Sequence, residues 1–247
     1  MDWLDGSQSI PAACEVVMLL AIHQPNFMPW AGFFHKWMIS DAMLLLDTVQ
    51  YEKNEWQNRN RIKTAHGVQW MTVPVNYRYP QTIREVGIAD RRWPRKLSIS
   101  IEQAYAKAPY IGDYWPELRK VMHEPYDLLR DLNAALIRVL GGFLGCSAPL
   151  YMASDLGVEN TDPTGRLLEL CDALKADAYL SGQEGRVYLD RDVFASRGIS
   201  LYFQAVEAPV YPQLYGAFAS HLSVLDMLLN VGPEAAALVR NMGDKTA

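Results

Sequence analysis

The chain has 247 residues, of which half are hydrophobic and 21% are charged, and its formal net charge is −5. This composition provides enough apolar side chains for a sizeable core, and the acidic balance gives no reason to expect nucleic-acid binding. The three cysteines are too few for a disulfide framework and match no metal-binding spacing, which favours a reducing cytoplasm and argues against a structural metal.

The first 17 residues precede the first clear strand. The apolar stretch from Pro11 to Ala21 is short and follows Asp2 and Asp5 rather than a basic region, so it makes a poor signal peptide and is too short to span a membrane. We expect residues 1–17 to be an N-terminal extension or a misassigned start, poorly ordered or peripheral. Residues 18–247 are expected to form a single α/β domain.

Strands and helices alternate from residue 18 onward. An apolar run over 18–23 predicts a buried strand, a helix is expected near 32–40, and a second buried strand over 42–46. Two short apolar strands on either side of a helix indicate a βαβ unit and a parallel sheet. Further along, the pattern predicts a hairpin turn at 65–67 before a strand at 68–75, a strand at 82–88, and helices starting at Trp93 and Tyr114 and covering 126–144.

The last third of the chain returns to alternating elements. Strands are expected at 149–153, 178–180 and 199–203, the last being the final strand, with a helix at 163–175. The sequence therefore predicts an α/β fold: a mostly parallel sheet flanked by helices, with an inserted or appended helical region over about 92–146. In such folds, active loops follow the carboxyl ends of strands.

The segment from Ile22 to Lys36 carries the strongest functional signal. Its strand ends at His23, and Pro25 and Pro29 then disfavour helix and fix the local path. Histidine suits proton transfer near neutral pH, so we predict a catalytic His23; the alternative is a core histidine satisfied by backbone groups. The other candidate binding residues of this segment are Gln24, Asn26, Trp30, His35 and Lys36.

A second candidate segment follows the second strand, where Asp47 is placed to orient the histidine. Amides, aromatic rings and basic groups occur together here, a combination that suits a sugar ring with an attached phosphate or carboxylate. The alternative is an ordinary solvated loop. The candidate substrate-binding residues are Gln50, Tyr51, Asn54, Gln57, Asn58, Arg59, Asn60 and Lys63.

Two later features complete the candidate site. Ser181 and Arg186 belong to a loop after a predicted strand and could hold an anion, although a plain strand-to-helix turn explains them equally well. Cys171 lies among leucines at helical spacing, which favours buried packing. The functional alternative for Cys171 is a thiolate nucleophile that receives an acyl group, with His23 as base and Asp47 orienting the histidine.

Taken together, the segments 22–36, 45–51, 56–63 and 179–182 resemble the WbqC-like family, from about Met18 to the C-terminal helix. Members are found with bacterial O-antigen and other cell-surface or specialised biosynthetic pathways. They are commonly described as glycine or aminoacyl transferases acting on amino-sugars. The resemblance thus implies a cytoplasmic transferase that forms an amide bond on an amine, for example a nucleotide-linked amino-sugar.

The activated donor stays open between an acyl or aminoacyl thioester, with an acyl or peptidyl carrier protein as a partner, and ATP. A weaker similarity to adenylating nucleotidyltransferases points to an adenylate-forming ligase, but Trp30 and Phe33 replace the histidines of their signature. A non-catalytic module that binds a sugar or a carrier protein is the third alternative. No metal is expected.

Overall fold

A six-stranded sheet lies at the centre of the computed structural model, which describes residues 17–247. The neighbours from β9 to β7 are parallel, and β10 joins β9 in the antiparallel direction. This confirms the predicted α/β fold. The expectation for residues 1–17 lies, except for Val17, outside the described residues. In spatial order the strands are β10 (Gly243–Thr246), β9 (Ser200–Val206), β8 (Ala178–Ser181), β1 (Leu19–His23), β2 (Ala42–Leu45) and β7 (Leu150–Met152).

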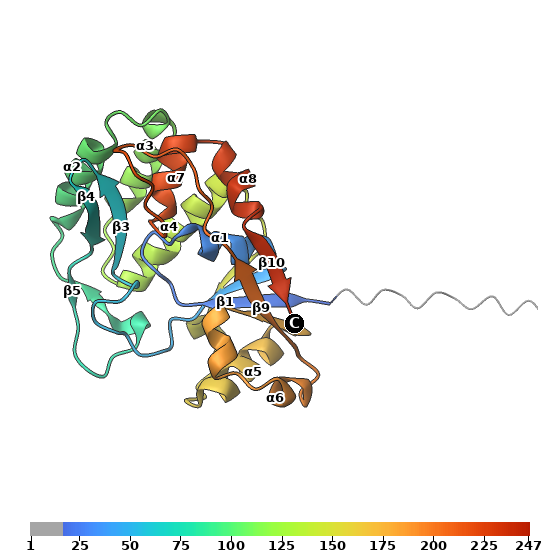
Figure 1. Ribbon diagram of the computed structural model, residues 1–247. Coiled ribbons are helices and arrows are strands. Elements are labelled where there is room, and N and C mark those ends of the chain that lie inside the picture. Colours follow the sequence, from blue (N-terminus) through green and yellow to red (C-terminus); the bar gives the residue numbers. More distant parts are fainter. Residues whose placement is uncertain (1–16) are drawn as a thin grey trace, which may run out of the picture.

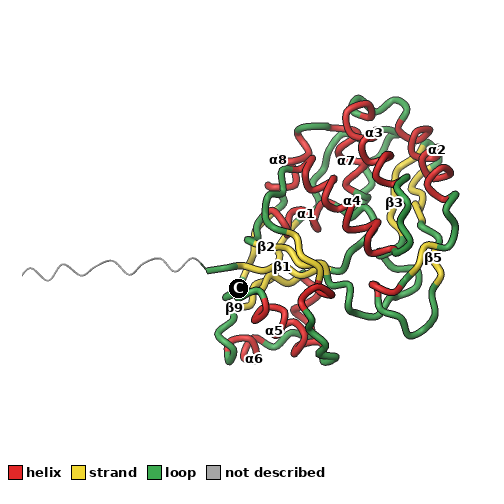
Figure 2. Tube along the Cα trace, turned by 180° about the vertical axis from the view of Figure 1, so that it is seen from behind, coloured by secondary structure: helices red, strands yellow, loops and turns green. Residues whose placement is uncertain are grey.

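The central parallel strands β1, β2 and β8 are buried on both faces, which explains why they read as continuous apolar runs. Successive residues point to opposite sides: Ala21 and Met43 belong to one core cluster, and Leu20 and Leu44 to the other. Figures 1 and 2 agree on the helices that cover each side. The first side carries α1 (Ala31–Met38), α4 (Leu129–Leu144), α7 (Val224–Val231) and α8 (Glu234–Arg240), and the second carries α5 (Pro163–Ala173) and α6 (Arg191–Ala195).

A long insertion separates β2 from β7. It begins with an antiparallel hairpin and a second small strand pair, and continues through the helices that the sequence predicted. Figure 1 shows these strands on the side of the molecule opposite the C-terminus. The elements are β3 (Arg59–Thr64), β4 (Gly67–Thr72), β5 (Val75–Asn76), β6 (Gly87–Ile88), α2 (Trp93–Tyr105) and α3 (Ile111–Met122), followed by α4.

Three predicted boundaries were wrong. The strand expected at 82–88 is a 3-10 helix at Ile83–Glu85 followed by the short β6, because the Thr82 and Glu85 side chains form a capping box that favours helical turns. Helix α3 begins before Tyr114, and Pro116 lies inside it. The strand at 199–203 is not the last, since β10 adds to its outer edge.

In the described part of the chain, no helix is both long and apolar enough to cross a membrane. Across residues 17–247, no group of three or more His, Cys, Asp or Glu side chains is arranged to hold a metal ion.

Candidate functional site

The strand order places a topological switch between β1 and β8. After β1 the chain builds outward through β2 to β7, and helix α5 then returns it to the other side of β1, where β8 and β9 follow. The loops after β1 and β8 therefore diverge, and in open parallel sheets such a divergence forms the crevice in which ligands bind. His23 ends β1 and Ser181 ends β8, so both predicted residues lie at this switch.

Lys36 extends from helix α1 to this switch and is almost completely buried, with 3% of its surface exposed. Its Nζ donates a hydrogen bond of 3.4 Å to the carbonyl oxygen of Ile22, and a Cβ added at Gly182 would lie 3.8 Å from the same amine. Burial lowers the pKa of Lys36 to about 8, partly offset by the negative charge of Glu184. Within the described residues, no carboxylate forms an ion pair with this amine.

His23 is half-buried beside this cation. Its Nδ1 lies 3.0 Å from the carbonyl oxygen of Gln24, and its ring meets Phe33 edge-on with ring centres 5.0 Å apart. Because a carbonyl oxygen only accepts, Nδ1 carries the proton and the lone pair of Nε2 stays available. Burial, and next the charge of Lys36, lower the pKa of His23 to about 3, so the imidazole is neutral at physiological pH.

Three amide side chains hold the loop that follows His23. Asn133 of α4 donates from Nδ2 to the carbonyl oxygens of Pro25 and Gln57, each at 2.7 Å. Asn60 donates to the carbonyl oxygens of Phe27 and Met28 at 3.2 and 2.8 Å. The Nε2 of Gln57 donates to the Oε1 of Gln24 at 2.6 Å.

These contacts change the reading of the amide-rich segment. Gln57, Asn58 and Asn60 are buried, and Asn58 donates to the carbonyl oxygen of Val73 at 3.0 Å. Of the amides predicted to bind substrate, Asn60 therefore holds the backbone after His23, Gln57 holds the Gln24 side chain, and Asn58 holds the start of the segment after β4. Gln50 and Asn54 are exposed on the surface, and Asn26 is half-buried in the loop after His23.

Asp47 does not orient His23 as predicted. The carboxylate is fully buried at the end of β2, where its Oδ2 accepts from Arg130 at 3.0 Å and its Oδ1 from the backbone N–H of Ser154 at 2.9 Å. It thus ties β2 to helix α4 and to the end of β7. The histidine's Nδ1 is occupied by a backbone carbonyl instead.

Other predicted residues serve the scaffold. His35 binds the carbonyl oxygen of Gly243 and the amide of Gln204, at 3.1 and 2.9 Å, which joins α1 to the outer strands. Cys171 is fully buried on the opposite side of the sheet, and burial raises the pKa of its thiol to about 12. That environment disfavours a thiolate, so the arrangement of Cys171 with His23 as its base is not formed.

Arg186 lies in the turn after β8 and contacts the outer strands β9 and β10. Its guanidinium lies 4.5 Å from the ring centre of Phe203 and donates to Thr246. It lines an open groove of about 560 Å³ with Tyr188, Arg191 and Phe203. Ser181 itself is buried.

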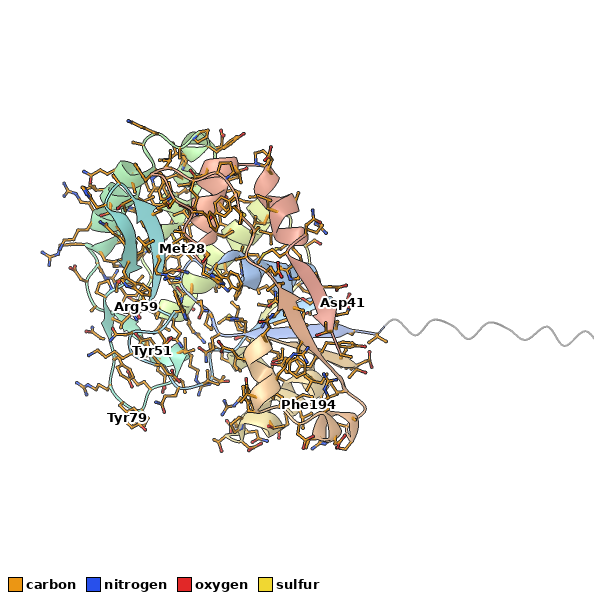
Figure 3. The ribbon with its side chains drawn as sticks, in the orientation of Figure 1. Met28, Asp41, Tyr51, Arg59, Tyr79 and Phe194 are labelled. Carbon is orange, nitrogen blue, oxygen red and sulfur yellow. The ribbon has the colours of Figure 1, made fainter. Side chains whose placement is uncertain are left out.

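The hairpin presents a further group of predicted residues. Arg59 is half-buried beside Tyr51, as Figure 3 shows, and Tyr51 packs against Tyr77 with ring centres 4.8 Å apart. Lys63 is buried, and its Nζ donates to Gln213 and to the carbonyl oxygens of Gly216 and Ala217.

Trp30 covers the start of α1. A Cβ at Gly32 would lie 2.1 Å from its indole, so only glycine allows this approach. Its ring also packs against His221, with ring centres 4.9 Å apart.

Sequence reasoning missed four residues of this region: Arg61, Trp70, Arg130 and Glu184. Arg61 and Trp70 face each other across the hairpin, a pairing that the predicted turn could have suggested. Glu184 lies in the turn directly after β8. Arg130 reaches the end of β2 from helix α4, and no spacing in the sequence signals that approach.

Comparison with known proteins identifies the family. The model of the WbqC-like protein family matches residues 24–238, and the chain belongs to this family. It is 36% identical over 225 residues to the uncharacterized protein Rv1507c of Mycobacterium tuberculosis, an alignment that covers 90% of this chain and 97% of that protein. No solved structure matches the chain.

Proposed function

We propose that this member of the WbqC-like family is a cytoplasmic transferase that forms an amide bond between an activated acyl or aminoacyl group and an amine. The acceptor we favour is a nucleotide-linked amino-sugar. The observation that carries the proposal is the buried Lys36 amine beside neutral His23 at the switch between β1 and β8. A buried cation without a counter-ion is costly, and such groups mark sites that receive negative charge.

In the proposed reaction, the acceptor amine attacks the carbonyl carbon of the donor. A C–N bond forms, negative charge develops on the carbonyl oxygen, and the bond to the leaving thiolate or adenylate breaks. The Lys36 ammonium is placed to stabilise that oxyanion, since electrostatic stabilisation is strongest where water is excluded.

His23 is proposed to accept the proton that the amine loses and to pass it to the leaving group. Its neutral state supports the role of acceptor, because Nδ1 is held by Gln24 and Nε2 keeps its lone pair. Negative charge near Lys36 would weaken the repulsion between its ammonium group and a protonated His23. The pKa of His23 would then rise as the oxyanion forms.

Product mass spectrometry tests this proposal. Purified protein is incubated with nucleotide-linked amino-sugars and a panel of acyl or aminoacyl thioesters, or with amino acids and ATP. We expect an amide product with wild type and with Cys171→Ala, and a loss of at least about 100-fold with His23→Gln or Lys36→Met. Full turnover by both of these variants would overturn the proposal.

A second candidate, an adenylate-forming ligase, is favoured by the strand order alone. Counted along the parallel strands, the order β7-β2-β1-β8-β9 is the 3-2-1-4-5 arrangement of doubly wound nucleotide-binding sheets. Pyrophosphate release that depends on ATP and on an acyl acid, but not on an amine acceptor, would identify this alternative.

A further inference from the structure

One face of the β3–β4 hairpin and the turn before it carry two arginines and two tryptophans, which we call the arginine–tryptophan cluster: Trp56, Arg59, Arg61 and Trp70. Arg61 pairs directly with Trp70 across the strands, and the period of two places Arg59 on the same face. Trp56 and Trp70 are 38% and 48% exposed, and their ring centres are 5.5 Å apart. The aromatic surface is thus open to a ligand.

The arginines stack on these rings instead of pairing with carboxylates. The guanidinium carbon of Arg59 lies 4.1 Å from the centre of Trp70, and that of Arg61 lies 5.4 Å from Trp56. The Nε atoms of both arginines are buried and have no hydrogen-bond partner, and neither arginine forms an ion pair with a described residue. Donors that are shielded from water and unpaired are suited to the oxygens of an anion.

Lys63, on the same strand as Arg59, is a cation with a structural role and serves as a comparison. Its Nζ is buried and is satisfied by three acceptors, at distances of 2.7 to 3.3 Å, from the segment over residues 213–217. The Nε of Arg59 has no such acceptor, although it is equally hidden from water. The hairpin thus binds Lys63 to the rest of the protein, whereas Arg59 stacks on Trp70 and keeps a hydrogen-bond donor without an acceptor.

The cluster is joined to the segment that carries His23. The backbone N–H of Phe27 donates to the carbonyl oxygen of Trp56 at 2.9 Å, and Gln57 binds Gln24. Arg61 also donates to the carbonyl oxygen of His221, whose ring packs against Trp30. A ligand on the cluster would therefore contact a surface continuous with the loop after β1.

We propose that the arginine–tryptophan cluster binds the nucleoside diphosphate part of the acceptor, with the base stacked on the indoles and the diphosphate on the arginines. This inference rests on the proposed function for the identity of the acceptor. Planar rings stack on tryptophan without strict base selection, and guanidinium forks match phosphate oxygens.

Calorimetric titration with uridine diphosphate tests the proposal without any need for turnover. Trp70→Ala is expected to weaken binding about 5- to 100-fold, and Trp70→Phe less, because phenylalanine keeps a ring. Arg59→Gln is expected to weaken binding about tenfold or more, with Arg59→Lys in between. The matched control is Arg197→Gln, which removes an exposed arginine paired with Asp172 on the opposite side of the sheet and should bind as wild type does.

Three further ligands show how much the base, the sugar and the phosphates each contribute to binding. Adenosine diphosphate should bind within a few-fold of uridine diphosphate, whereas pyrophosphate and glucosamine 1-phosphate should bind at least about tenfold more weakly. Equal binding of pyrophosphate would overturn the stacking of a base, and equal binding of glucosamine 1-phosphate would overturn the assignment to a nucleoside. No binding of uridine diphosphate to wild type, or unchanged affinity in both Trp70→Ala and Arg59→Gln, would overturn the site itself.

Lys36→Met distinguishes this inference from the proposed function. Nucleotide affinity is expected to stay within about threefold of wild type in that variant, because Lys36 is assigned to the oxyanion and not to the nucleotide. Loss of product with intact nucleotide binding supports both ideas. Nucleotide binding that depends on the cluster, in a protein with no transferase activity, supports this site and contradicts the proposed reaction.

Discussion

The amine of Lys36 and the imidazole of His23 lie close together at the end of β1, and the pKa of each is lowered. Desolvation is the first cause for both, and the charge of Lys36 further lowers the pKa of His23. A scaffold gains no stability from placing a buried amine beside a histidine whose protonation it opposes. The two residues therefore lower the stability of the fold, a cost that is common where residues serve a function.

The first prediction follows from the buried charge of Lys36. Its folded pKa of about 8 is lower than the usual 10.5, so the charged amine destabilises the native state below pH 8, and the penalty is lost only above pH 10.5. At neutral pH the penalty is roughly 3 kcal/mol. Lys36→Met should therefore raise the free energy of unfolding by about 1–3 kcal/mol while product formation is lost. A urea-unfolding curve checks this, and a destabilised Lys36→Met would show that the amine is well compensated.

The second prediction concerns acid stability. The folded pKa of His23 is about 3 and the usual value is 6.5, so the unfolded state binds a proton that the native state does not. The stability that this group contributes is complete above pH 6.5 and falls as the pH drops toward 3, by up to about 1.4 kcal/mol per pH unit.

Unfolding free energies at pH 6.5 and 5.0 isolate this effect, since most carboxylates are still ionised in that window. Between pH 6.5 and 5.0 the free energy of unfolding of His23→Gln should fall by about 2 kcal/mol less than that of the wild type. Lys36→Met should also show a shallower decline, because the repulsion that contributes to the shift is gone. Equal declines in all three proteins would contradict the assigned protonation state.

The third prediction concerns the amide that positions the loop after His23. Asn133→Ala leaves the carbonyl oxygens of Pro25 and Gln57 without a donor, which should cost about 2–4 kcal/mol. Asn58→Ala, which removes a single hydrogen bond to Val73, is the matched control and should cost about 1 kcal/mol. Hydrogen exchange at the backbone amide of Phe27 should become faster in Asn133→Ala. Unchanged exchange would mean that the loop is held by other contacts.

The sequence predicted the sheet and the place of the site better than the roles within it. Buried strands read as apolar runs, and His23 at the end of β1 follows from that pattern alone. The amides Gln57 and Asn60 carry the same chemistry whether they face a ligand or a carbonyl oxygen. The burial of Lys36 depends on a return of the chain from β7 to β8 that no local pattern encodes.

The fourth prediction separates a positioning role from a catalytic one for Asp47. Its carboxylate is fully buried and paired, so Asp47→Ala should destabilise the protein by about 1.5–3 kcal/mol, because Arg130 and the backbone N–H of Ser154 both lose this acceptor while Arg130 keeps its ion pair with Asp131. Asp47→Ala combined with Arg130→Met should cost less than the sum of the two single changes. The turnover of the folded fraction should stay within a few-fold of wild type. A large loss of turnover in a folded Asp47→Asn would instead restore the predicted link to His23.

The last prediction concerns covalent catalysis. Cys171 is buried among apolar side chains and the pKa of its thiol is raised to about 12, so almost no thiolate exists at neutral pH. Cys171→Ala should therefore leave product formation unchanged and cost about 1–2 kcal/mol of stability through a small cavity. Intact-mass spectra after incubation with acyl or aminoacyl thioesters should show no adduct in wild type that Cys171→Ala lacks. Cys146→Ala controls for adventitious acylation of the other free cysteine in the described part of the chain. A labile adduct that disappears only in Cys171→Ala would show that helix α5 opens to admit the donor, and direct transfer to the amine would then be wrong.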